Sequence, residues 1–269
     1  YYQWFYNRQN INGYLGFQQY RYLEGDYEKM TSAPYPEDSI LLPEIYADMQ
    51  KCWAEGKPCF SFSVNVQSHG PYATWDTGAK EYLSGDGYTA ECRNAVNAYM
   101  DTIMETDREL AAFIDRLRED PNPVILVTFG DHLPWMGDGN VFYEEMGVDV
   151  SPATDEGFYR HYTTRYLIWA NDAAKEIIGH DVAGEGPAVS PCYLMNLVFD
   201  QLGWEGPGFM QAMDEMMEVF PIASTTGRTM TDGVLSGRVP EERLELYRRF
   251  QYLQHYWRNE FLYQDVMGE

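Results

Sequence analysis

The length, composition and charge of the chain restrict the classes of partner it can have. Its 269 residues suffice for one large α/β domain or two small ones, and 45% of them are hydrophobic, so an ordinary core can form. The formal net charge of −23 argues against nucleic acid as a partner and against docking on anionic lipid headgroups. An anionic substrate would bind only where a metal ion or a few arginines reverse the local field. No apolar run reaches the roughly 18–20 residues that cross a bilayer, and no signal peptide is recognisable.

The first twenty residues are rich in aromatic side chains, which would form either a packed loop layer or a rim facing a ligand. Within them, Tyr6 and Arg8 place a guanidinium group beside aromatic rings. Arginine binds phosphate or carboxylate in a bidentate manner, and an aromatic wall lowers the dielectric constant around such a contact. The alternative is a surface arginine stacked on a tyrosine.

The next segment predicts a helix, a strand and a loop. Apolar residues at helical spacing predict a helix over residues 40–49, and a Gly-Lys-Pro sequence ends it. Residues 60–66 alternate apolar and polar side chains, which predicts a β-strand. This strand leads into residues 67–72, whose Gly-Pro pair indicates a loop, and the loop carries His69.

The four cysteines do not identify the compartment. None has CxxC spacing, which argues against a thiolate zinc site. Cys52 and Cys59 flank a short Gly/Pro loop, so they would form a disulfide in an oxidising compartment or remain as thiols.

A long amphipathic helix is predicted over residues 91–119, because its apolar residues recur at helical spacing. Two prolines stop it, and residues 124–129 follow as a buried strand. A helix, a short turn and a strand form half of a βαβ unit, which points to a parallel sheet. Asp131 and His132 come immediately after Gly130 at the end of this strand, where α/β proteins usually place their chemistry.

The rest of the chain supports an α/β fold. Residues 137–157 are predicted as a loop-rich insertion, residues 163–170 as a strand, and residues 194–202 as a helix that ends at Gly203. From these elements we expect a three-layer α/β/α sandwich around a mostly parallel sheet, with helices on both faces.

The composition shifts after about residue 225, which predicts a boundary between residues 1–225 and 226–269. Arg and Glu become dense over residues 241–258, with Tyr, Phe, Leu and Trp at helical spacing. This pattern predicts an amphipathic helix that packs across the domain. The alternative is a surface for a partner or a membrane.

Three groups at two strand ends are candidates for chemistry. If both strands lie in one parallel sheet, His69, Asp131 and His132 emerge on the same edge. Carboxylate oxygen and imidazole nitrogen are a common ligand pair for Zn²⁺ or Mn²⁺. Asp131 and His132 would then hold a metal ion, and His69 would contact the anionic oxygens or leaving group of a substrate. The alternatives are a helix cap for Asp131 and hydrogen-bonded turn residues for the histidines.

Three ordered motifs together resemble the lipoteichoic acid synthase family of the alkaline phosphatase/sulfatase superfamily. The strand followed by Gly130-Asp131-His132-Leu133-Pro134 is similar to the metal-binding signature of this family. Residues 62–72 resemble its second histidine motif. The aromatic-x-Arg segment that ends at Arg8 resembles the part that cradles the glycerophosphate of the substrate, with Tyr6 where we expect a Trp. The resemblance covers roughly residues 3–205.

The resemblance implies a sulfatase-like fold and a metal-dependent phosphotransferase or phosphodiesterase. In such proteins a divalent cation, usually Mn²⁺ with Zn²⁺ or Mg²⁺ as alternatives, activates a threonine that attacks the headgroup phosphate of phosphatidylglycerol. The glycerophosphate group then passes to a growing cell-envelope polymer. By this resemblance Asp131 and His132 are metal ligands, and Tyr6, Arg8 and His69 are substrate contacts. The implied location is the extracellular face of the bacterial cytoplasmic membrane.

The resemblance also implies which parts of the site the chain lacks. The threonine nucleophile, the acidic metal ligand and the membrane anchor are expected upstream of Tyr1, so the chain would be the C-terminal part of a catalytic domain, with residues 226–269 as a helical extension. We therefore expect the isolated chain to be inactive and to bind a divalent metal weakly. The alternatives are a sulfatase or phosphodiesterase of the same superfamily, or a non-catalytic envelope domain that binds anionic glycans or phosphates.

Overall fold

The computed structural model of the protein describes residues 2–31, 33 and 35–259. These residues divide into two compact units. The first unit comprises the chain up to Asn122 together with His132–Val150, and the second comprises Pro123–Asp131 together with the chain from Ser151 onward. Among the described helices, none is both long enough and apolar enough to span a membrane.

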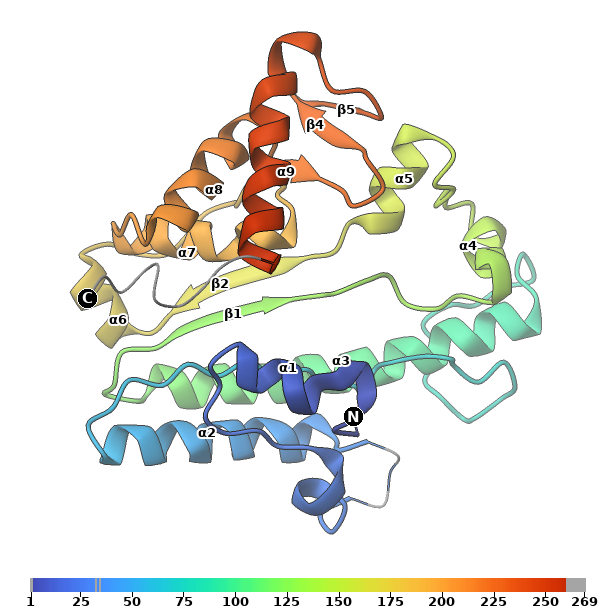
Figure 1. The fold of residues 1–269 in the computed structure, drawn as a ribbon. Coiled ribbons are helices and arrows are strands. Elements are labelled where there is room, and N and C mark those ends of the chain that lie inside the picture. The colour runs from blue at the N-terminus through green and yellow to red at the C-terminus, as the bar shows by residue number, and fades with distance from the viewer. Residues whose placement is uncertain (1, 32, 34, 260–269) are drawn as a thin grey trace. The chain divides into compact units, whose positions relative to one another are not determined.

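The first unit is helical. Its helices are η1 (Phe5–Asn7), α1 (Arg8–Tyr14), η2 (Leu23–Tyr27), α2 (Asp38–Ala54), α3 (Ala90–Arg118), η3 (Asp138–Asn140) and α4 (Val141–Glu145). The predicted helices over residues 40–49 and 91–119 are confirmed as α2 and α3, which lie side by side in Figure 1. The Thr89 side chain caps α3 by accepting a hydrogen bond from the backbone N–H of Cys92 at 3.2 Å.

A hydrogen bond joins the middle of α2 to Asp120, two residues beyond the end of α3. The Tyr46 hydroxyl donates to the Asp120 carboxylate at 2.6 Å. Burial raises the pKa of Asp120, but the hydrogen bonds from Tyr46 and Asn122 outweigh it, so the pKa lies below its ordinary value of 3.8. A carboxyl group whose pKa is lowered by folding stabilises the protein above its unfolded pKa. This stability is lost as the pH falls through the folded value.

Tyr46→Phe is therefore expected to lower the free energy of unfolding by about 1 kcal/mol at pH 7, because the carboxylate loses a donor. The difference from wild type should shrink as the pH falls through the folded pKa, which lies below 3.8, because the wild-type carboxylate is then protonated. Urea unfolding at pH 7 and pH 3 measures this difference. Tyr252→Phe is the control, since Tyr252 is 71% exposed. An equal loss at both pH values would show that the ionised carboxylate does not matter.

The main core of the first unit joins α3, α4 and the loop after residue 66. Its buried residues are Tyr72, Cys92, Ala95, Met136 and Phe142. Trp135 and Tyr143 pack against this cluster. The core therefore holds together the two segments that carry His69 and His132.

The prediction of a strand over residues 60–66 is wrong, because these residues form no strand in the structure. Phe60 is 69% exposed and Phe62 is 58% exposed, whereas Val66 is buried. An alternating pattern defines two faces, but a strand also needs a neighbour that completes its hydrogen bonds. The alternation therefore does not by itself predict a strand, because it does not show that a neighbouring strand is present.

The second unit contains two of the predicted strands, those expected over residues 124–129 and 163–170. They are confirmed as β1 (Ile125–Phe129) and β2 (Tyr166–Ala170), and Figure 1 shows them side by side. They pair antiparallel, with Ile125 opposite Ala170 and Phe129 opposite Tyr166. β1 is half-buried rather than fully buried, and Phe129 at its end is exposed.

The prediction of a mostly parallel sheet is therefore wrong for the described strands, which pair antiparallel. The second sheet, of β3 (Ile222–Ala223), β4 (Thr229–Thr231) and β5 (Val234–Ser236), is also antiparallel. The parallel prediction rested on the helix before β1, which forms only half of a βαβ unit. In the described chain β1 pairs instead with the strand that follows it, which returns in the opposite direction.

Helices complete the second unit. They are α5 (Asp155–Tyr162), α6 (Asp172–Ile178), η4 (Pro191–Tyr193), α7 (Leu194–Leu202), α8 (Gly208–Val219), η5 (Glu241–Arg243) and α9 (Leu244–Asn259). The helix predicted over residues 194–202 is confirmed as α7. It ends at Gly203, whose φ of +61° suits glycine. The predicted C-terminal helix is confirmed as α9, which packs on α8 (Figure 1) around the buried Tyr193, Met213 and Met216.

The four cysteines are free thiols. Burial and the neighbouring Cys52 thiol raise the pKa of Cys59 to about 11. Because the thiolate is the reactive form, Cys59 stays largely inert at neutral pH.

Candidate active site

The loop that carries His69 is fixed by its own hydrogen bonds and by packing. The backbone N–H of His69 donates to the carbonyl of Val66 at 3.0 Å, and the Tyr72 hydroxyl donates to the carbonyl of Ser68 at 2.8 Å. Burial, followed by the nearby Tyr99 and Tyr143, raises the pKa of Tyr72 well above its ordinary value, so it remains a donor.

A close approach between two segments brings the histidines together. A methyl group built on Gly70 would lie 3.0 Å from Cβ of Trp135, so the loop after His69 packs directly against the residues after His132. The Trp135 ring packs edge-on against Phe142, with 6.2 Å between ring centroids. The Tyr143 hydroxyl donates to the carbonyl of Pro134 at 3.1 Å. The segments that carry the two histidines therefore both pack against the core of the first unit.

The rings of His69 and His132 pack edge to face. Their centroids are 5.6 Å apart and the interplanar angle is 89°. Nδ1 of His69 contacts the carbonyl of Gly70 at 2.6 Å, and Nδ1 of His132 contacts the carbonyl of Leu133 at 2.7 Å. A carbonyl oxygen can only accept, so each Nδ1 carries the hydrogen and each neutral ring has its lone pair on Nε2. Such a nitrogen can bind a cation or accept a proton.

Asp131 is exposed and follows β1 in the second unit. The residue before it, Gly130, is held by two hydrogen bonds. Its N–H donates to the carbonyl of Arg165 at 3.2 Å, and the Thr164 hydroxyl donates to its carbonyl at 2.7 Å. A side chain on Gly130 would press against Thr164, because a built Cβ would lie 3.2 Å from Cβ of Thr164. The backbone that leads into Asp131 is therefore closely fitted.

The predicted substrate contacts at the N-terminus lie on η1 and α1. Tyr6 is 73% exposed, has a φ of +53° and packs against Phe5 with 4.3 Å between ring centroids. Arg8 is the first residue of α1 and is half-buried. The structure thus brings together His69 and His132, with Asp131 next to His132 along the chain. The roles of Tyr6 and Arg8 stay predictions.

The donor types at the histidine pair suit a divalent metal ion, but the described residues supply an incomplete set. Imidazole nitrogen with a carboxylate is a usual combination for Mn²⁺ or Zn²⁺. Within the described ranges, no group of three or more His, Cys, Asp or Glu residues is arranged to hold a metal ion. The described residues offer the two imidazoles and the carboxylate of Asp131, which precedes His132 in the sequence.

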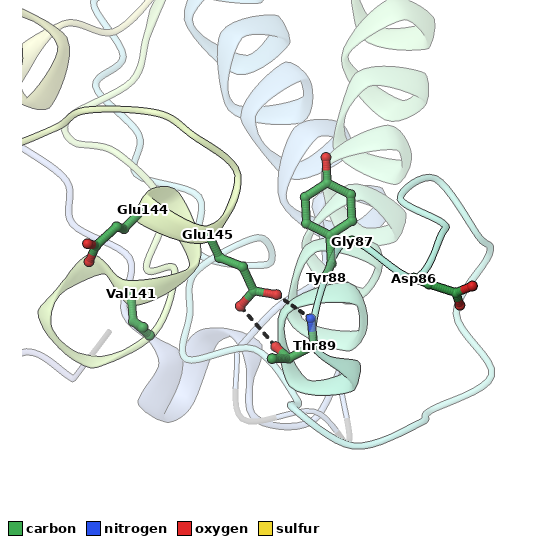
Figure 2. A pocket seen from close by; sticks show the side chains of 7 residues that line it. All are labelled: Asp86, Gly87, Tyr88, Thr89, Val141, Glu144 and Glu145. Atoms are coloured by element: carbon green, nitrogen blue, oxygen red, sulfur yellow. Dashed lines mark hydrogen bonds between the residues drawn. The ribbon is translucent and has the colours of Figure 1, made fainter.

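A hollow of about 540 Å³ lies elsewhere in the first unit and was not expected from the sequence. It is lined by Asp86, Gly87, Tyr88, Thr89, Val141, Glu144 and Glu145. Figure 2 shows the Glu145 carboxylate turned to Thr89, where it accepts from the backbone N–H and, at 2.9 Å, from the hydroxyl. This bond ties α4 to the start of α3. The hollow contains none of the predicted site residues.

The chain is similar in sequence to two proteins of Rhizobium meliloti. A putative cyclic β-1,2-glucan modification protein of Rhizobium meliloti is 25% identical over 265 residues, which cover 94% of this chain and 38% of that protein. The capsular polysaccharide biosynthesis protein RkpI of the same organism is 28% identical over 131 residues, 48% of this chain and 22% of that protein. The chain thus spans about two fifths of the length of the first relative.

Among solved structures, the Streptococcus pyogenes phosphoglycerol transferase GacH in complex with sn-glycerol 1-phosphate is similar in fold. The TM-score is 0.65 at 17% sequence identity, and the match covers 94% of this chain and 58% of that chain. This likeness confirms the expected sulfatase-like α/β fold. The sulfatase family profile matches residues 1–203, close to the range of the resemblance noted from the motifs. The chain belongs to the sulfatase family, within the alkaline phosphatase superfamily.

Proposed function

We propose that the chain takes part in the metal-dependent transfer of a phosphoglycerol group from a phosphatidylglycerol-like lipid to a cell-envelope glycan. Sulfatase-family membership and the likeness to a phosphoglycerol transferase support phosphoryl-group transfer in general. Two relatives named for glucan modification and capsular polysaccharide biosynthesis support a glycan as the acceptor. The reaction would take place at the extracellular face of the cytoplasmic membrane.

The observation that carries this proposal is the pair of imidazoles at His69 and His132. Both rings are oriented by a backbone carbonyl, and both have the Nε2 lone pair of the neutral tautomer. A phosphodiester needs groups that bind its oxygens and move a proton while charge develops on them. Two oriented imidazoles supply such groups, and Asp131 adjoins His132 in the sequence.

The residues would divide the work as follows. Asp131 and His132 would hold a divalent cation, Mn²⁺ by preference. A bound cation would lower the pKa of a hydroxyl nucleophile and neutralise phosphoryl charge. His69 would accept a proton at Nε2 and, once protonated, donate from Nε2 to a phosphoryl oxygen or to the leaving group. Arg8 would pair with phosphate oxygens, and Tyr6 would pack on the glycerol.

Binding of sn-glycerol 1-phosphate in the presence of Mn²⁺ tests the proposal. We expect His69→Ala to weaken binding at least tenfold, because the hydrogen bond that the protonated ring would donate from Nε2 to a charged oxygen is lost. His180→Ala is the matched control. Its ring is exposed, and both of its nitrogens contact backbone carbonyls, at 3.0 and 3.1 Å. Equal binding by the wild-type and His69→Ala proteins would contradict the proposal.

A hydrolase of the same family would also bind the ligand, so transfer must be separated from hydrolysis. Release of free glycerol phosphate from a phosphatidylglycerol vesicle, with no label passed to an added glucan, would identify a phosphodiesterase. Labelling of the glucan would support transfer.

A further inference from the structure

We propose that Asp38 is a positioning residue for His69, which it orients through a buried hydrogen-bond network. This inference rests on the proposed function, because it assigns Asp38 to the residue proposed to contact the substrate. Asp38 is the first residue of α2 and is 1% exposed. Its neighbours in the network come from α3 and from the residues immediately before His69.

The Asp38 carboxylate is shared between two elements. Oδ2 accepts a hydrogen bond from the Thr106 hydroxyl of α3 at 2.6 Å and a longer one from the Asn65 side-chain amide at 3.3 Å. The backbone N–H of Asp38 donates to Oε1 of Gln67 at 2.6 Å. Asp38 therefore holds the side chains of two residues that lead into the His69 loop.

Thr106 extends the network to a third residue of the loop. Its hydroxyl hydrogen is given to Asp38, so its oxygen accepts from the Ser68 hydroxyl, 2.8 Å away. The carbonyl of Ser68 accepts from Tyr72, and the N–H of His69 donates to Val66. Hydrogen bonds therefore fix the backbone on both sides of His69. On the N-terminal side they continue from Ser68 through Thr106 to Asp38.

A purely local role at the start of α2 does not account for Asp38. The residue at the N-cap position is Glu37, whose side chain makes no capping hydrogen bond, and Thr106 and Asn65, which donate to the Asp38 carboxylate, lie outside the helix. The helix dipole favours an acidic residue there, but it would favour an exposed one equally.

Burial of the Asp38 carboxylate is costly. Its Oδ1 atom is buried and has no hydrogen-bond partner among the described residues. The same is true of Oε2 of Glu37. A buried charge with an unsatisfied oxygen lowers stability unless it is compensated. A residue that costs stability and fixes a candidate active-site loop is typical of a site organised for function.

Three variants test this role. Asp38→Ala removes the acceptor, Asp38→Asn keeps its shape and one oxygen, and Thr106→Val removes the relay without touching the carboxylate. We expect Asp38→Ala and Thr106→Val to weaken binding of sn-glycerol 1-phosphate with Mn²⁺ about tenfold, and Asp38→Asn to restore most of it. Tyr46→Phe is the control, because it removes a donor to a carboxylate at the other end of the same helix pair.

The nuclear magnetic resonance signals of the His69 ring separate positioning from stability. Long-range ¹H–¹⁵N spectra should show one Nδ1–H tautomer in the wild-type and Tyr46→Phe proteins and averaged signals in Asp38→Ala and Thr106→Val. Unchanged His69 signals and unchanged binding in the folded variants, with binding lost in His69→Ala, would overturn the role of Asp38 and leave the proposed function intact. Undiminished binding in His69→Ala would overturn the proposed function, and the His69 signals would still decide whether Asp38 positions the ring. If Asp38→Ala does not fold, Thr106→Val and Asp38→Asn decide alone.

Discussion

His132→Ala is expected to lower the rate of phosphoglycerol transfer by the natural full-length protein about a thousandfold. The substitution removes an imidazole proposed to hold the cation, and electrostatic stabilisation of developing phosphoryl charge is usually the largest contribution to such a rate. The fold should survive, because His132 is exposed and the core beneath it is formed by Trp135, Met136 and Phe142. The assay follows transfer from phosphatidylglycerol vesicles to a glucan, with Mn²⁺ in excess.

The control for this prediction is again His180→Ala, which should keep the wild-type rate. Asp131→Ala should resemble His132→Ala, because both residues are proposed ligands of the same ion. A His132→Ala protein that transfers phosphoglycerol at more than a tenth of the wild-type rate would contradict the assignment. Raising the Mn²⁺ concentration should recover part of the activity if weaker ion binding is the cause.

The helices and the strands that the sequence predicted well are those with strong local signals. The apolar spacing of α3 and the prolines after it define that helix without reference to the rest of the molecule. The same is true of β1, whose apolar run ends at a glycine, and of α7, which ends at Gly203 with a positive φ. Such signals act within a few residues, so they can be read from the chain directly.

Pairing between distant segments could not be predicted in the same way. Residues 60–66 have the alternation of a strand and form none, and β1 pairs with β2 in the opposite direction from the one expected. Which neighbour a strand takes depends on contacts far apart in sequence, and a single sequence does not contain that information.

The proximity of His69 and His132 is confirmed, although its physical cause differs from the predicted one. His69 and His132 were expected to meet because two parallel strands would end at one edge. They meet because the Gly70 backbone packs against Trp135 over the core formed with α3. Asp38 was not recognised as a candidate, because an acidic residue at the start of a helix usually needs no further explanation. Only the burial of its carboxylate and the contact with Thr106 distinguish it.

Phe220→Ala is expected to destabilise the second unit by about 3–5 kcal/mol, the range for removing a large buried aromatic side chain. Phe220 is 0% exposed, and its ring packs edge-on against Tyr247 of α9, with 5.6 Å between centroids. It follows α8 directly and precedes β3. The cavity left by alanine would therefore lie where α8, α9 and the start of the second sheet meet, and these elements cannot all close around it.

Thermal and urea unfolding measure the loss, which should appear as a fall of roughly 10 °C in the midpoint of the transition that reports on the second unit. Ile177→Ala is the control, because Ile177 is 73% exposed and its removal should change the free energy of unfolding by less than about 0.5 kcal/mol. Phe220→Leu should lose less than Phe220→Ala, since it refills most of the cavity. If Phe220→Ala unfolds like Ile177→Ala, the packing of α9 over this residue does not stabilise the unit, and α9 would then be free to serve as the partner surface considered for the C-terminal helix.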